Sequence, residues 1–169
     1  GTEAALMRSE FEQMIDETEG HPAADSEAPV FLDSEDLNDL VDLIRAVERS
    51  HNLILMLTRE VLLRPWVLVE IATAVREGVN IIPVSITKPG SEFNFPDDTF
   101  YEDMLRGKLL GSGTQVITNH GFSMEAVCDA IRRTFQRISL PYSPHRTAII
   151  RKAECQAILK QCAIRQIKV

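Results

Sequence analysis

The chain has 169 residues, of which 44% are hydrophobic and 25% are charged, a composition typical of globular domains and unlike that of disordered chains. No apolar run reaches the ~18 residues that a membrane-spanning helix needs, and the acidic N-terminal stretch lacks the basic-then-apolar pattern of a secretory signal. The three cysteines, Cys128, Cys155 and Cys162, are not spaced like metal ligands. We therefore expect a cytoplasmic protein with reduced thiols and no membrane span.

The net charge of −7 is unevenly distributed along the chain. Residues 1–40 carry 12 acidic side chains and 1 basic one, whereas residues 131–169 carry 9 basic side chains and 1 acidic one. Two interpretations are open: two oppositely charged faces of one domain, or a basic segment that binds an anionic partner or the acidic face of another copy. The arginines are not interleaved with the aromatic residues of a single-strand binding platform, so we expect no nucleic-acid partner.

The first quarter of the chain predicts a helix, a loop and a strand. Residues 3–18 are good helix formers with apolar residues near helical spacing, and a loop rich in Gly, Pro and Ala follows. The apolar run VFLD, residues 30–33, is typical of a buried strand.

The middle of the chain alternates helices and strands. A helix is expected over 34–50, with Leu37, Leu40, Ile44 and Val47 on one stripe. Strands are expected over 52–58 and 79–86, the second interrupted at Pro83, which lacks an amide donor and predicts a bulge or a poorly paired position.

A longer helix lies between those two strands. Its regular part is expected to begin near Pro65 and to stop at Gly78.

The last third predicts a short helix over 99–109, a fourth strand over 114–119 and a helix over 123–138. Ser123 is the expected N-cap of that helix, and Ile138 is expected near its core stripe. After the SLPYSPH break, a basic helix is expected from about Arg146.

These elements predict an α/β fold. Strands that alternate with helices through short loops form βα units and a parallel sheet, and near-continuous apolar strands require cover on both faces. We therefore expect a doubly wound sheet with an extra C-terminal helix. Ligands bind such sheets at the carboxyl ends of the strands, which points to the loops after Asp33, Thr58 and Ile86.

Glu70 is the only ionisable residue between Pro65 and Val75. Helical periodicity places it with Trp66, Thr73 and Glu77, away from the stripe expected to pack on the sheet. One interpretation is a solvated side chain. The other is a half-buried carboxylate that, beside the aromatic ring of Trp66, hydrogen-bonds sugar hydroxyls and stabilises a cationic sugar centre.

Other arrangements point less clearly to chemistry. Five acidic residues gather over 33–42 and could ligate Mg²⁺, but acidic residues at the start of a helix need no metal, so no metal site is expected. The histidines are scattered singly, and the GSG at 111–113 is too short for a phosphate cradle. Cys155 and Cys162, seven residues apart, are expected to be packing residues.

Four motifs then occur in the order found in Toll/interleukin-1 receptor (TIR) domains. VFLDSEDL starts at Val30, a helix ending in Ser50 leads into NLILMLT, PWVLVEI contains the W-x-x-x-E pattern, and GVNIIPV starts at Gly78. This succession, over about residues 4–138, resembles a TIR domain.

The resemblance implies a flavodoxin-like parallel sheet and a role in signalling. It implies a TIR-like domain over 1–140, followed by a basic helical extension over 141–169 that the resemblance does not cover. The family's first strand would precede Gly1, so we expect either a chain truncated before that strand or another segment in its place.

The resemblance also implies two alternative functions. Some TIR domains cleave NAD⁺ at the nicotinamide–ribose bond with a glutamate that matches Glu70; Trp66, Asp33 and Ser34 would then bind this substrate, and no further cofactor is implied. Others are scaffolds that bind other TIR domains or themselves. The interaction loop in either case matches Glu35, Asp36, Leu37, Asn38 and Asp39.

Overall fold

The computed structural model describes residues 2–24, 30 and 40–167. Among these residues, three parallel strands form one sheet in the order β1-β2-β3. The strands are β1 (Asn52–Leu57), β2 (Asn80–Ile86) and β3 (Leu140–Tyr142). The chain is therefore an α/β protein with a parallel sheet, as predicted, and most of the strand predicted at 30–33 lies outside the described residues.

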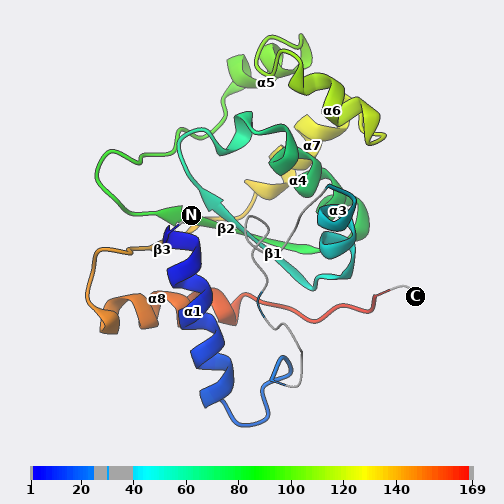
Figure 1. Cartoon of the computed structure of the whole chain (residues 1–169). Coiled ribbons are helices and arrows are strands. Elements are labelled where there is room, and N and C mark those ends of the chain that lie inside the picture. The colour runs from blue at the N-terminus through cyan, green and yellow to red at the C-terminus, as the bar shows by residue number, and fades with distance from the viewer. Residues whose placement is uncertain (1, 25–29, 31–39, 168–169) are drawn as a thin grey trace.

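Helices connect and cover the strands (Figure 1). They are α1 (Thr2–Glu17), α3 (Leu40–Arg49), α4 (Pro65–Glu77), α5 (Asp98–Leu105), α6 (Gly113–Asn119), α7 (Met124–Thr134) and α8 (Ala148–Lys160), with a single 3₁₀ turn, η1 (Val61–Leu63), before α4. In the described part of the chain, no helix has the length and apolar character needed to cross a membrane.

The sheet separates two hydrophobic cores. Helices α3, α4 and α7 cover one face, and α1 and α8 cover the other (Figure 1). Side chains alternate between the two: Leu55 and Ile81 face the α4–α7 core, whereas Ile82 and Val84 face the α1–α8 core. This two-sided burial is why the strands are apolar at nearly every position, and it confirms the prediction of cover on both faces.

Pro83 does not produce a bulge. The β1–β2 register is unbroken, with Leu55 opposite Pro83. On the other side of β2, pairing with β3 begins only at Val84, so at Pro83 the described sheet has no neighbour on that side. The missing amide is therefore tolerated without a change of register.

The strand predicted at 114–119 is wrong, because these residues form α6. The β-branched residues of this segment favour a strand locally, but packing on α4 makes it a helix. Ile117 is fully buried in the α4–α7 core, and Gly113 lies against Pro65. The third described strand is β3, which comes from the segment expected to be a break. Pro141 is accommodated there because β3 is an edge strand of the described sheet.

One helix boundary near the C-terminal end also differs from the prediction. Helix α7 ends at Thr134, so Ile138 does not join a core stripe; it is 92% exposed. The expected boundary between residues 140 and 141 falls inside β3. Helix α8 confirms the predicted basic helix, and its Cys155 and Ile158 are buried in the α1–α8 core.

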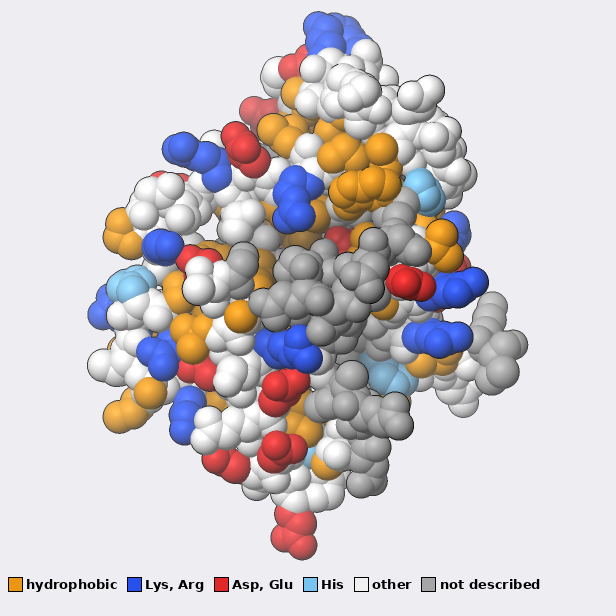
Figure 2. All heavy atoms as spheres, viewed as in Figure 1, with side chains coloured by type: hydrophobic (Ala, Val, Ile, Leu, Met, Phe, Trp, Pro, Cys, Tyr) orange, Lys and Arg blue, Asp and Glu red, His pale blue; other side chains and the backbone are white. Residues whose placement is uncertain are grey.

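The acidic N-terminal part of the chain contacts the basic C-terminal part. The acidic α1 packs on the basic α8, and Arg151 Nε donates to Glu10 Oε1 at 2.7 Å. Figure 2 shows acidic and basic side chains interspersed over the region of these two helices. These contacts favour the interpretation of oppositely charged parts of one domain.

Candidate functional site

Helix α4 carries the predicted catalytic glutamate and is fixed at both ends. Pro65 occupies the first helical turn, where its missing amide costs nothing, and Gly78 caps the C-terminus in the left-handed conformation with φ 71°. Residues 67–74 are all buried. The helix is therefore buried against the rest of the α4–α7 core along most of its length.

Glu70 is not a solvated side chain. Only 9% of its surface is exposed, and Thr73 on the same side of the helix is fully buried. The Thr73 hydroxyl has no hydrogen-bond partner within the described part of the chain, which is unusual for a buried polar group. The side of α4 that carries Glu70 is thus polar and covered, in agreement with the half-buried alternative.

Trp66 lies one turn before Glu70 and is 42% exposed. Its ring meets His120 edge-on, with ring centroids 5.9 Å apart and planes at 71°. Nδ1 of His120 lies 2.6 Å from the carbonyl oxygen of Val116 and donates to it, because a carbonyl oxygen can only accept.

No sequence signal indicated His120. It is 54 residues from Trp66 and lies in a segment that was expected to follow a strand, and only the folding of α6 onto α4 brings the two rings together.

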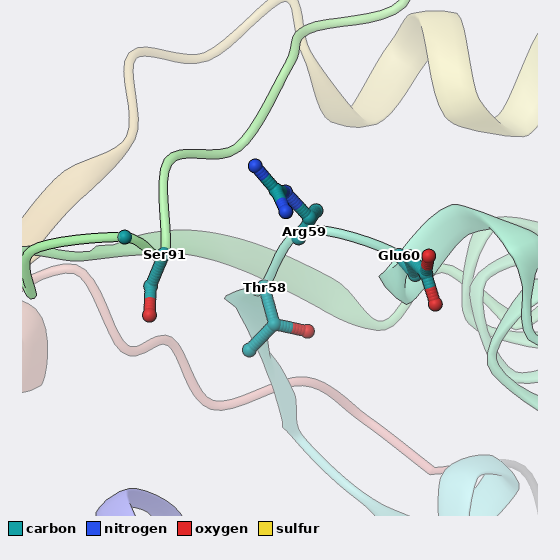
Figure 3. A pocket seen from close by; sticks show the side chains of 5 residues that line it. Thr58, Arg59, Glu60 and Ser91 are labelled. Carbon is teal, nitrogen blue, oxygen red and sulfur yellow. The ribbon is translucent and has the colours of Figure 1, made fainter.

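An open cavity of about 430 Å³ lies where the carboxyl ends of the strands were expected to form a ligand crevice. Thr58, Arg59 and Glu60 after β1 line one side, and Gly90 and Ser91 after β2 line the other (Figure 3). Neither Trp66 nor Glu70 lines this cavity.

The cavity residues Gly90 and Ser91 belong to a tight turn over Lys88–Ser91. The Ser91 amide donates to the Lys88 carbonyl at 3.1 Å, and Gly90 has φ 79°, so only glycine fits there without strain.

The remaining predicted site residues, Asp33, Ser34 and the interaction loop over 35–39, lie outside the described residues. Within the described residues, no group of three or more His, Cys, Asp or Glu side chains is arranged to hold a metal ion.

Cys155 and Cys162 pack in the α1–α8 core, as predicted. Burial raises the pKa of Cys128, and burial together with the charge of Glu10 raises the pKa of Cys155 to about 12. A thiol with such a pKa stays protonated and unreactive at neutral pH.

Comparison with family models, with curated proteins and with solved structures gives no match to this chain.

Proposed function

We propose that this chain is a TIR-like domain that cleaves NAD⁺ at the nicotinamide–ribose bond, with Glu70 as the catalytic carboxylate. The observation that carries the proposal is the burial of Glu70 on α4, one turn from the half-exposed ring of Trp66. A carboxylate removed from water interacts more strongly with a nearby positive charge than a solvated one does.

The arrangement of the sheet supports the family part of the proposal. The flavodoxin-like strand order is 2-1-3-4-5. The order β1-β2-β3 is compatible with its last three strands, as is the division of α1 and α8 from α3, α4 and α7 across the sheet.

The reaction would proceed by dissociation. The bond between C1′ of the ribose and the pyridinium nitrogen breaks, and its electron pair leaves with neutral nicotinamide. Glu70 would accept hydrogen bonds from the ribose hydroxyls and stabilise the oxocarbenium-like transition state. Water then adds at C1′ and loses a proton, which gives ADP-ribose; attack by a group of the same nucleotide would give a cyclic product instead.

Self-association is part of the proposal. Glu70 and Trp66 do not line the carboxyl-end cavity, so a neighbouring copy would complete the site beside them. Leu63 and Trp66, each 42% exposed near the start of α4, offer apolar surface for that contact.

The test is nicotinamide release from NAD⁺ by the purified protein, measured over a range of protein concentrations. We expect release to rise more than linearly with protein concentration and to fall at least about 100-fold in Glu70→Ala and Glu70→Gln. Glu77→Ala is the matched control, because Glu77 lies on the same helix, is exposed and forms a salt bridge with its neighbour Arg76.

The second candidate is a scaffold that binds other TIR domains without catalysis. The exposed Leu63 and Trp66 favour it equally. Concentration-dependent association in sedimentation, with no nicotinamide release from the associated protein, would select this function and reject the enzymatic one.

A further inference from the structure

The segment after α8 crosses the amino-terminal edge of the sheet, opposite the carboxyl-end cavity. Figure 1 draws it in red, running from α8 toward the end marked C. Side chains at the start of β1 and β2 hold it: Asn52 and Asn80 open the two strands and are paired in register, and His51 precedes β1.

These side chains bind the main chain of the segment at every second residue. Asn80 Nδ2 donates to the carbonyl of Gln161 at 2.9 Å. Asn52 forms a two-point pair with Ala163, accepting from its amide at 2.8 Å and donating to its carbonyl at 3.0 Å. The amide of Arg165 donates to His51 Nδ1 at 3.1 Å.

Residues 163 and 165 therefore turn their main-chain groups toward the sheet, as alternate residues of an extended peptide do, whereas Gln161 is the C-cap of α8 and has helical backbone angles. Ile164, between them, points away and is 69% exposed. Main-chain hydrogen bonds do not depend on side-chain identity, so this part of the contact tolerates many sequences.

Side chains add specific contacts: Gln161 Oε1 accepts from Arg137 Nη2 at 3.2 Å, and Arg165 makes the largest set. Its Nε donates to the carbonyl of Ser50 at 2.8 Å, Nη2 donates to that of Glu48, and Nη1 donates to that of Glu77 at 3.3 Å. These carbonyls are the last ones of α3 and α4, where helices have unsatisfied acceptors and partial negative charge. Only a planar guanidinium presents several donors in a fork that meets three acceptors at once.

We propose that this edge of the sheet is a binding site for a peptide segment that carries arginine, filled in this molecule by the chain's own residues 161–165. The site reads the main chain through His51, Asn52 and Asn80 and selects arginine through the carbonyl ends of α3 and α4. The same segment of a second copy fits it equally well. This proposal does not rest on NAD⁺ cleavage.

The chain's own residues 161–165 are tethered to the site and therefore compete at a high effective concentration. A separate peptide binds only when the contacts of these residues with the site are weakened. The experiment uses the full chain carrying Arg165→Ala and a fluorescent synthetic peptide of residues 160–167, with binding followed by anisotropy under reducing conditions. We expect at least about tenfold tighter binding to Arg165→Ala than to the wild type. Arg146→Ala, the same change at an exposed arginine, should behave as the wild type.

Two further binding measurements test which contacts recognise the peptide. A peptide carrying Arg165→Lys should bind at least about tenfold more weakly, because the lysine ammonium cannot reproduce the fork. Adding Asn52→Ala to the Arg165→Ala protein should abolish binding, since the two-point pair with residue 163 is lost. Equal binding to wild type and Arg165→Ala, or equal binding of the lysine peptide, would overturn the proposal.

A measurement on the unmodified protein covers the case in which Arg165→Ala does not fold. Hydrogen exchange should be slow at the amides of Ala163 and Arg165, which donate to Asn52 and His51, and at least about tenfold faster at Ile164 and Gln166. Uniformly fast exchange over these four residues would show that the segment is not held as described.

Discussion

Glu10 is the centre of a polar cluster inside the α1–α8 core. Its carboxylate accepts from Tyr142 Oη at 2.9 Å, from Arg151 Nε at 2.7 Å and from Cys155 Sγ at 3.5 Å. A buried carboxylate is tolerated only when its oxygens are satisfied in this way. Three separate elements, α1, β3 and α8, thereby depend on one side chain.

Tyr142 makes this cluster sensitive to alkaline pH. Burial, with the hydrogen bond to Glu10 and its negative charge, raises the pKa of Tyr142 well above the ordinary value of 10.0. Above pH 10 the unfolded chain loses this proton and the folded one keeps it, so the free energy of unfolding falls as the pH rises.

Urea unfolding at pH 7, 9, 10.5 and 11 tests this prediction. We expect Tyr142 to contribute a decrease of about 1.4 kcal/mol per pH unit above pH 10. Tyr142→Phe should lack that contribution and be about 1–2 kcal/mol less stable at pH 7, because one donor to Glu10 is lost. Tyr101, the other tyrosine, is present in both proteins and cancels from the comparison. Parallel pH profiles for the two proteins would contradict the prediction.

At the scale of single residues, the sequence pointed to Glu70 but could not decide its burial. Periodicity places Glu70 on a side of α4 away from the sheet, and water or another helix can lie on that side. The polar cluster around Glu10 could not be predicted for the same reason, because its partners Tyr142 and Arg151 are more than 130 residues away in the sequence. Contacts at such separation leave no local pattern.

At the scale of elements, α6 depends on a close approach at its first residue. A Cβ added to Gly113 would come within 2.5 Å of Cγ of Pro65, at the start of α4. The backbone of α6 therefore packs directly on the proline ring, and any side chain larger than hydrogen forces the two helices apart.

We expect Gly113→Ala to lower the free energy of unfolding by about 1–3 kcal/mol, despite the better helix propensity of alanine. Chemical denaturation checks the change, and Ser112→Ala, at the exposed neighbouring position, is the control. A stabilised Gly113→Ala protein would mean that propensity outweighs the contact.

The sequence predicted most elements correctly because their own residues dictate them. The apolar runs of β1 and β2, the Pro65 and Gly78 limits of α4 and the Ser123 cap of α7 are local signals, and the structure confirms each: the Ser123 side chain accepts from the amide of Ala126 at 3.1 Å. Residues 114–119 lack such a signal. A run of that length is compatible with either strand or helix, and packing on α4 decides between them.

At the scale of the whole molecule, β2 belongs to both cores. Ile81 faces the α4–α7 core, and Ile82, Val84 and Ile86 face the α1–α8 core. The smaller core is closed by α1, whose Phe11 is almost completely buried. Loss of α1 would expose one face of the central strand.

We expect Phe11→Ala to destabilise the protein by about 3–5 kcal/mol and to lower a single, shared unfolding transition. Far-ultraviolet circular dichroism and tryptophan fluorescence measure this, since Trp66, the only tryptophan, lies near the other core. Gln13→Ala, an exposed change on the same helix, is the control. Separate transitions by the two probes would show that the cores unfold independently.

The whole arrangement was predictable from the sequence only in outline. Alternating strands and helices predicted a parallel sheet covered on both faces. Which helix covers which face depends on long-range contacts such as that of Arg151 with Glu10. The position of residues 161–165 depends on hydrogen bonds to strand ends that precede them by over 80 residues.

Helix α4 joins the two ends of the sheet as a rod of about 20 Å, at 1.5 Å per residue. Trp66 lies in its first turn and Glu70 one turn further on, and the carbonyl of Glu77 at the other end accepts a hydrogen bond from Arg165. A ligand that binds one position of helix α4 more tightly than another changes the affinity of the protein for the arginine peptide. Thermodynamic linkage then requires the peptide to change the affinity for that ligand by the same factor. The two ends of the sheet would then report on each other through a single helix.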